Sequence, residues 1–197
     1  MSFKALSKYV SALSSGAALI VIMACGGAES ASDDSPAQPA EAGFSVQAGE
    51  LFAANPDEPR LRNVRQLTFE GENAEAYFAY DGTRLIYQRT PESGGCDQIY
   101  TYDLTTGEQA LVSTGEGRTT CSYYYPGDER ILYASTHAAS AQCPAPPDMS
   151  MGYVWAVYPS YDLYAADADG SNVVRLTETD GYDAEATISP TGDRIIF

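Results

Sequence analysis

The stretch from Ala184 to Phe197, AEATISPTGDRIIF, occurs three times in this chain in related forms. The two earlier copies read AEAYFAYDGTRLIY at residues 74–87 and CSYYYPGDERILY at residues 121–133. In each copy, two runs rich in β-branched and aromatic residues flank a short turn containing Gly, which predicts a β-hairpin. A hairpin that returns at intervals of about 45 residues is typical of a propeller or a solenoid.

The spacing of the copies predicts an insertion in one of them. The arginine after the turn recurs at Arg84, Arg130 and Arg194, at intervals of 46 and then 64 residues. A leucine that ends another strand of the unit shows the same lengthening at Leu67, Leu111 and Leu176. We therefore expect one repeat unit to carry an extra segment, which we place at residues 137–160.

Each unit is expected to supply four strands of one blade. The chain then contains an isolated fourth strand near residues 61–67, two full units, and the first two strands of a third. This predicts an all-β fold, a partial β-propeller of four-stranded antiparallel blades over residues 59–197 with about two and a half blades present. We interpret the chain as the front part of a longer propeller or the product of a truncated gene.

The first residues have the layout of an export signal. Lys4 and Lys8 precede an apolar stretch over residues 9–24 that is too short for a membrane-spanning helix. The stretch ends in IMACG, which resembles a bacterial lipobox, and this resemblance implies cleavage after residue 24 and lipid attachment at Cys25. The alternative is an ordinary signal peptide cut nearby. Gly26 after the cysteine resembles the pattern for sorting to the outer membrane.

Residues 25–58 are expected to form a lipid-anchored, acidic and disordered tether. The clearest part, residues 26–43, contains four acidic residues and no basic one, and the rest is mostly Gly, Ala, Ser, Pro and Gln. Such a composition buries too little apolar area to offset chain entropy. A flexible segment as long as residues 26–43 spans roughly 25 Å from end to end.

The charge of the chain argues against nucleic-acid binding. Eleven basic and 27 acidic residues give a formal net charge of −16. A phosphate backbone or an anionic lipid surface is repelled by such a protein, which leaves the lipid anchor as the only expected link to a membrane. The acidic surface either steers cationic partners or is simply solvated.

Three cysteines remain after the predicted lipid-attachment site: Cys96, Cys121 and Cys143. Export favours a disulfide, and an odd number leaves at least one cysteine without an intramolecular partner. The blade pattern places all three at one end of the blades. We prefer Cys121–Cys143, which would tie the insertion to its own blade, over Cys96–Cys121. A zinc site fits poorly because the spacings are long and the chain has one histidine.

The signatures of a catalytic site are missing from this sequence, and no cofactor is expected. The chain has no G-x-S-x-G, no Walker loop and no H-E-x-x-H. His137 lies beside no recognisable nucleophile. Glu75 and Glu185 occupy equivalent positions at the start of a strand, with Cys121 as the third member. These carboxylates either ring the mouth of a central channel, where a cation or basic peptide would bind, or accept local hydrogen bonds from backbone or Arg groups.

The insertion is the best candidate for a partner-binding site. It contains a proline-rich run, CPAPP at residues 143–147, and the aromatic residues Tyr153, Trp155 and Tyr158. Long loops in compact domains are often functional, and Tyr and Trp are common interface anchors. The alternative is a lid that covers apolar blade surface.

The repeat resembles a known family. A Leu-Thr pair, then Ser-Pro-x-Gly-x-Arg-Ile-Ile-Phe, then Ile-Tyr-x-x-Asp is similar to the WD-like β-propeller repeat of the TolB family, over residues 61–197. The second copy departs from it at Pro126–Glu129, where we expect an altered turn. The lipobox and the tether distinguish the chain from TolB itself and indicate a lipid-anchored relative.

The resemblance implies a fold more strongly than a function. We expect an exported cell-envelope lipoprotein, in the outer membrane facing the periplasm, whose propeller is a non-enzymatic scaffold for a protein or another ligand. The alternative is the propeller portion of an exported hydrolase similar to prolyl-oligopeptidase, or of a carbohydrate-active lyase, with the catalytic part elsewhere.

Overall fold

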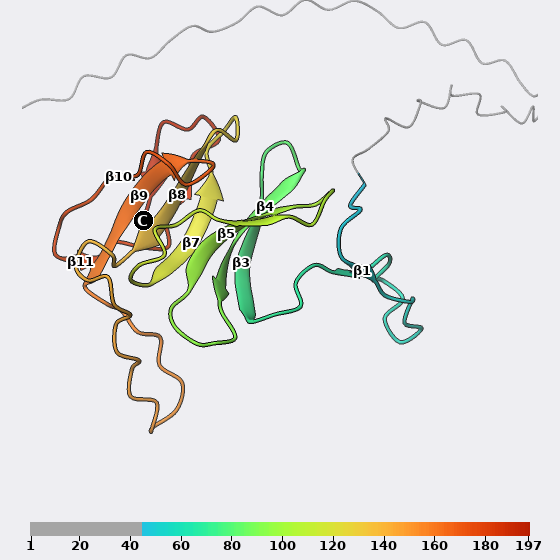
Figure 1. The fold of residues 1–197 in the computed structure, drawn as a ribbon, viewed down its shortest axis with the longest axis horizontal. Coiled ribbons are helices and arrows are strands. Elements are labelled where there is room, and N and C mark those ends of the chain that lie inside the picture. Colours follow the sequence, from blue (N-terminus) through green and yellow to red (C-terminus); the bar gives the residue numbers. More distant parts are fainter. Residues whose placement is uncertain (1–44) are drawn as a thin grey trace, which may run out of the picture. The chain divides into compact units, whose positions relative to one another are not determined.

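The computed structural model describes residues 45–197, which form strands and loops and no helix. The predicted signal peptide, Cys25 and the tether up to residue 44 lie outside the described residues. Between residues 45 and 197, no segment forms a helix of the length and apolar character needed to cross a membrane. Figure 1 shows two sheets standing side by side, with the long connection after β8 projecting beyond one end of them.

The first blade is a four-stranded antiparallel sheet with its strands in chain order. They are β3 (Glu72–Phe78), β4 (Arg84–Thr90), β5 (Gln98–Asp103) and β6 (Gln109–Leu111). The β3–β4 turn contains Gly82 at φ +69°, a left-handed conformation that glycine adopts without a steric penalty. The first repeat unit therefore forms the predicted blade.

The second blade repeats this arrangement with β7 (Thr119–Tyr124), β8 (Arg130–Ser135), β9 (Ser160–Asp167) and β10 (Val174–Arg175). A short strand after it, β11 (Gly181–Tyr182), pairs in parallel with the start of β9. The inserted segment is the connection between β8 and β9, at the predicted place in the unit.

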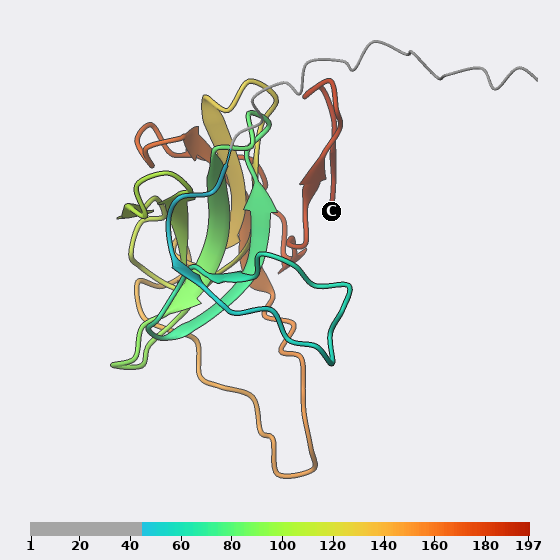
Figure 2. The same ribbon diagram turned by 90° about the vertical axis from the view of Figure 1, so that its right-hand side faces the viewer.

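Two strand pairs flank the full blades. At the C-terminal side, β12 (Thr187–Ile188) and β13 (Ile195–Ile196) form the hairpin of a third unit, which is drawn in red in Figure 2. At the N-terminal side, β1 (Glu50–Leu51) pairs antiparallel with β2 (Arg65–Gln66). The predicted isolated strand thus has a partner, and the prediction of an all-β partial propeller is confirmed.

The packed part of the chain begins earlier than the predicted boundary at residue 59. The N–H groups of Gln47 and Ala48 both donate to the carbonyl oxygen of Leu104, at 3.0 Å each. Ala48 is buried, and Val46 packs beside it against the outer face of the first blade. Composition alone predicted disorder here because it does not show the apolar sheet face that these residues cover.

Strand β8 shows how the sheets are held together. Because successive side chains of a strand point to opposite faces, Ile131 and Tyr133 pack on one side of β8 and Leu132 and Ala134 on the other. The first pair joins a cluster with residues of the first blade, namely Ala79, Ile86, Ile99 and Val112. The second pair packs with residues near the third hairpin, Ala184 and Ala186. Burial of each large apolar side chain stabilises the fold by about 1.5–3 kcal/mol.

The three hairpins share a residue in the left-handed conformation at the same position. Glu75, Cys121 and Glu185 have φ values of +51°, +40° and +56°. The strand register shifts beside the first two of them. The equivalence predicted by aligning the arginines is therefore present in the backbone. At Glu75 and Cys121 the left-handed residue accompanies a β-bulge, which interrupts the regular alternation of side chains.

The second hairpin turn departs from the others, as predicted. Asp128 lies at φ +60°, in the place that Gly82 and Gly192 occupy in the other two turns. Its carboxylate accepts hydrogen bonds from the N–H groups of Tyr80 at 2.7 Å and Asp81 at 2.8 Å. The altered turn therefore links the second hairpin to the first.

Candidate functional site

A disulfide fixes the insertion to the neighbouring blade. Cys96, in the β4–β5 connection, is bonded to Cys143, in the β8–β9 connection, with a Cα–Cα distance of 5.6 Å. The prediction of a disulfide is confirmed, but the preferred pairing Cys121–Cys143 is wrong. The physical reason is the bulge at Cys121, which directs its thiol toward Glu185 instead of the end of the blade.

Cys121 is a buried free thiol. Its Sγ donates to Oε2 of Glu185 at 3.0 Å. Burial raises the pKa of the thiol to about 12, and the hydrogen bond to the Glu185 carboxylate adds to this. The thiol is therefore protonated at neutral pH and unreactive as a nucleophile.

The two predicted channel carboxylates each accept a local hydrogen bond. Tyr77 donates to Glu75 at 2.8 Å, and Tyr182 donates to the second oxygen of Glu185 at 2.9 Å. In the described part of the chain, no group of three or more His, Cys, Asp or Glu side chains is placed to hold a metal ion. The donors are tyrosine hydroxyls and, for Glu185, also the Cys121 thiol, instead of the backbone or arginine groups that the local alternative expected.

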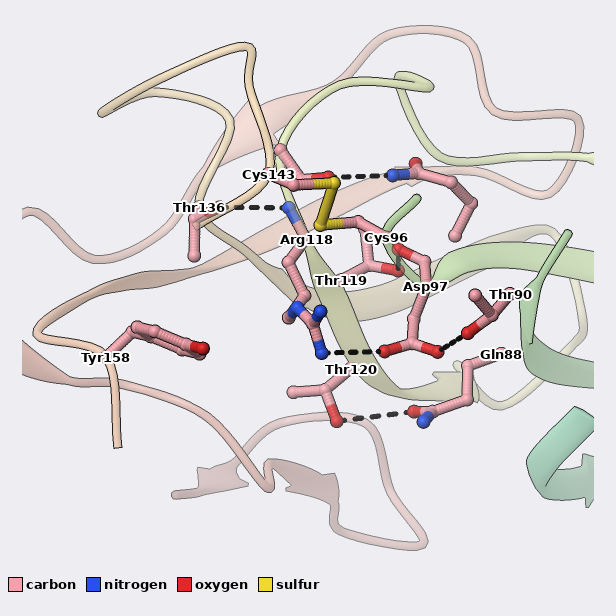
Figure 3. A network of polar contacts seen from close by, with 12 residues as sticks. Gln88, Thr90, Cys96, Asp97, Arg118, Thr119, Thr120, Thr136, Cys143 and Tyr158 are labelled. Carbon is pink, nitrogen blue, oxygen red and sulfur yellow. Dashed lines mark hydrogen bonds and ion pairs between the residues drawn. A yellow bond between two sulfur atoms is a disulfide. The ribbon is translucent and has the colours of Figure 1, made fainter. Parts of the chain in front are cut away.

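A polar network lies beside the disulfide, at the end of the two blades (Figure 3). Asp97 follows Cys96, and its carboxylate accepts from the Thr90 hydroxyl on one oxygen and pairs with Arg118 on the other at 3.3 Å. The backbone carbonyl of Asp97 also accepts from the N–H of Thr119 at 3.0 Å. These contacts tie the β4–β5 connection to the start of β7.

The second half of the network runs from β7 to β4. The Thr120 hydroxyl and the N–H of Cys121 both donate to Oε1 of Gln88, at 3.3 Å each. The Arg118 N–H donates to the Thr136 hydroxyl at 2.9 Å, where the insertion begins. Polar side chains thus form a floor between the blades at the base of the insertion.

Aromatic residues of the insertion and of the second blade form walls above this floor. Together they enclose a pocket of about 160 Å³, lined on the aromatic side by Tyr153, Trp155, Tyr158, Tyr161 and Tyr182 and on the polar side by Gln88, Asp97, Arg118 and Thr120. The three residues that the sequence singled out in the insertion therefore come together in one pocket.

The wall is held in place by hydrogen bonds of its own polar atoms. The Trp155 indole N–H donates to the Tyr182 hydroxyl at 3.3 Å, and the Tyr158 hydroxyl donates to the carbonyl of Ala145 at 2.8 Å. The Tyr161 and Tyr182 rings meet edge to face with centroids 5.5 Å apart. Burial raises the pKa of Tyr182 to about 12, so its hydroxyl is neutral over the physiological range.

The sequence did not point to several residues of this pocket. Asp97 and Arg118 were not singled out, although Asp97 directly follows a cysteine and Arg118 directly precedes β7. Tyr182 reaches the pocket because β11 pairs with β9, a parallel contact that the repeat pattern does not contain.

His137 has a hydroxyl neighbour that the sequence analysis did not identify. Its Nδ1 lies 2.8 Å from Oγ of Ser135, and its ring packs 4.2 Å from the Tyr164 ring. Burial lowers the pKa of His137. Because Ser135 is fully buried, its hydroxyl has no surface on which to meet a substrate, and we assign the pair to packing.

Comparison with known proteins defines the class of fold. The chain matches no family model and no curated protein. Among solved structures, TolB from Acinetobacter baumannii superposes with a TM-score of 0.50 at 23% identity, over 68% of this chain and 28% of that chain. The four-stranded blades described here are thus those of a TolB-like propeller.

Two further structures are similar to this chain. A protein described as TolB from Agrobacterium tumefaciens has a TM-score of 0.49 at 22% identity, over 66% of this chain and 39% of that one. A prolyl endopeptidase has a TM-score of 0.41 at 12% identity, over 64% of this chain and 18% of that one. The chain therefore spans less than half the length of each of these three proteins.

Proposed function

We propose that this chain is an exported, lipid-anchored cell-envelope protein whose TolB-like blades act as a non-enzymatic scaffold that binds a protein or another ligand. The binding surface is the end of the blades where the insertion projects, with Tyr153, Trp155 and Tyr158 in contact with the ligand. Glu75 and Glu185, at the left-handed positions of their hairpins, are assigned to holding the fold.

One observation carries the binding proposal. The insertion is fixed at its base by the Cys96–Cys143 bond, yet Tyr153 is 79% exposed and Trp155 is 55% exposed. Large aromatic side chains lose stabilisation when they stay in water, and they recur as anchors where a partner covers them. A rigid support for exposed aromatic rings favours binding because less conformational entropy is lost on association.

The localisation rests on the N-terminal residues. Lys4, Lys8 and the apolar stretch that follows them support export, and Cys25 in its lipobox-like context supports a lipid anchor in the outer membrane, facing the periplasm. The disulfide agrees with an oxidising compartment. Because acyl chains contribute about 0.8 kcal/mol per buried CH₂, a multiply acylated Cys25 would anchor the chain firmly.

Labelled palmitate tests the anchor. The full chain, expressed in a Gram-negative host, is expected to incorporate the label and to fractionate with the outer membrane, and Cys25→Ala is expected to lose both properties. Equal labelling of the two proteins would contradict the anchor.

A pair of photo-crosslinkers tests the binding surface. Benzoylphenylalanine is placed at Val157 in the insertion, which is 62% exposed, or at Val174 in β10, which is 51% exposed. We expect a discrete adduct in intact cells at position 157 and none at position 174. Adducts at position 174 alone would place the binding surface elsewhere.

A further inference from the structure

The pocket beneath the insertion has two unlike sides. The aromatic side comes from the insertion, β9 and β11, and the polar side from the first blade and the start of β7. A ligand that fits it must therefore present an apolar face to one wall and several hydrogen-bonding groups to the other.

The polar side carries no net charge. Asp97 and Arg118 neutralise each other at 3.3 Å, and the other polar side chains on this side, Gln88, Thr119 and Thr120, are uncharged. A charged ligand would have to separate this pair or lie beside it uncompensated. A strongly anionic ligand would also be opposed by the net charge of −16. The pocket therefore favours a neutral ligand.

The same floor supplies both donors and acceptors. The Nε of Arg118 is buried and has no hydrogen-bond partner among residues 45–197. The Gln88 carbonyl is engaged by Thr120 and by the N–H of Cys121, while its amide nitrogen, within the described chain, donates to no partner. The floor thus places a carboxylate, a guanidinium and an amide group side by side. Such a set suits a ligand with neighbouring hydroxyl groups, because each hydroxyl donates one hydrogen bond and accepts others.

The aromatic side offers ring faces more than it offers donors. The Trp155 N–H is used by Tyr182 and the Tyr158 hydroxyl by Ala145. The Tyr182 hydroxyl is likewise used by Glu185. This leaves the Tyr153 and Tyr161 hydroxyls, which have no partner among residues 45–197, beside a larger area of ring face. The ring faces favour stacking, in which polarised C–H groups lie on the negative face of an aromatic ring. A proline-rich peptide also docks in aromatic-lined grooves and is therefore the competing ligand in the test below.

From these features we infer that the pocket binds one ring of a neutral saccharide. A sugar ring has a C–H face for the Trp155 and Tyr158 side and hydroxyl groups for Asp97, Arg118 and Gln88. The volume of about 160 Å³ admits a single ring. Tyr153, 79% exposed at the margin of the pocket, provides a stacking surface for the next ring of an oligosaccharide. This inference rests on the proposed function and specifies the ligand class at the same surface.

Trp155 makes the test direct, because it is the single tryptophan of the chain and it lines the pocket. The full chain, in a detergent without a sugar headgroup, is titrated with chitohexaose, cellohexaose and maltohexaose while tryptophan emission is followed. We expect a saturable change with at least one of them. The same experiment is run with an eight-residue peptide of Pro-Ala-Pro-Pro repeats.

Three variants show where the saccharide binds. Tyr153→Ala is expected to raise the dissociation constant by about three- to tenfold. Asp97→Asn, which keeps the shape of the side chain, is expected to raise it by about tenfold. Tyr80→Ala, which removes a 56% exposed tyrosine outside the pocket, is expected to leave it unchanged. Circular dichroism confirms that each variant is folded.

Two results would overturn the inference. One is that none of the three oligosaccharides changes the tryptophan emission spectrum at about 10 mM, a concentration at which even weak specific binding would be seen. The other is saturable binding of the proline-rich peptide alone, which would assign the pocket to a peptide. An adduct at position 157 in cells, together with no saccharide response, would leave the scaffold function standing and remove the sugar.

Discussion

The interface between the two full blades and the insertion after β8 are both rich in tyrosine, but they use it in opposite ways. In the interface, Tyr133 and Tyr164 stack with centroids 5.8 Å apart and are 0% and 2% exposed. In the insertion, Tyr153 is 79% exposed. The same residue type thus stabilises the fold where two sheets cover it and offers a binding surface where a loop displays it.

The two regions also differ in how they are held. The interface is a continuous apolar cluster contributed by strands of both blades. The insertion is held by one disulfide and by a few hydrogen bonds, among them those of Trp155 and Tyr158. Changes in the first region, or at the disulfide that supports the second, should therefore alter stability. Changes at the exposed aromatic side chains of the insertion should alter binding with little effect on stability.

The largest effect is expected from Tyr133→Ala, which opens a cavity in the interface. Loss of a fully buried aromatic ring should lower the free energy of unfolding by about 4 kcal/mol in a urea titration. Tyr133→Phe is the matched control. Its hydroxyl is buried without a hydrogen-bond partner among the described residues, so its removal should leave stability equal or higher by up to ~1 kcal/mol. If Tyr133→Ala lowers the free energy of unfolding by less than about 1 kcal/mol, the interface between the blades is not the main source of stability. The contrast with the insertion would then be lost.

Loss of the disulfide tests how the insertion is held. Cys143→Ser removes a cross-link between residues 47 apart in the sequence and should lower stability by about 3 kcal/mol. Limited proteolysis should then cut within residues 136–159. Reductant should bring the unmodified chain to the same stability and leave Cys143→Ser unchanged. If reductant leaves the unmodified chain as stable and as protease-resistant as before, the bond is not what fixes the loop.

Asp128, at the turn between β7 and β8, separates polar from apolar contributions to the interface between the blades. Its carboxylate joins the first two hairpins through hydrogen bonds and adds no apolar contact. Asp128→Gly keeps the left-handed backbone but removes the carboxylate that accepts from Tyr80 and Asp81. We expect a loss of about 2 kcal/mol, measured by urea denaturation, because two backbone N–H groups lose a charged acceptor. Unchanged stability would mean that water replaces the carboxylate fully.

Alkaline pH should weaken the buried region selectively. Burial raises the pKa values of Cys121, Tyr124 and Tyr133 to about 12. The unfolded chain loses these protons near pH 9–10, about the ordinary values for thiols and phenols, while the folded chain keeps them. The contribution of these groups to the free energy of unfolding is therefore fully present below about pH 9. It falls as the pH rises toward 12, by up to ~1.4 kcal/mol per pH unit for each group. Tyr133→Phe should show a shallower fall, and an equal slope would contradict this assignment.

The smallest effect on stability is expected from Tyr153→Ala in the insertion. An exposed side chain whose removal creates no cavity should change the free energy of unfolding by less than about 0.5 kcal/mol. Paired with Tyr133→Ala in the same denaturation series, it measures the contrast between the two regions. A large loss of stability for Tyr153→Ala would show that the insertion is a structural lid.

What the sequence alone determined is the repeated and local part of this protein. The three hairpin copies, the equivalence of Glu75, Cys121 and Glu185, and the site of the insertion follow from patterns a few residues long. The reason is that strand alternation and turn geometry are set by neighbouring residues. The aromatic residues of the insertion were also identified as site candidates from composition and loop length.

The tertiary structure decided every feature that joins distant residues. Cys96 pairs with Cys143 because the β4–β5 and β8–β9 connections meet at one end of the blades, while Cys121 is turned away by its bulge. The pocket floor exists because Asp97 meets Arg118 across two blades, and its wall is completed by β11. Such contacts depend on how the sheets stack, and a pattern with a period of two residues carries no information on that stacking.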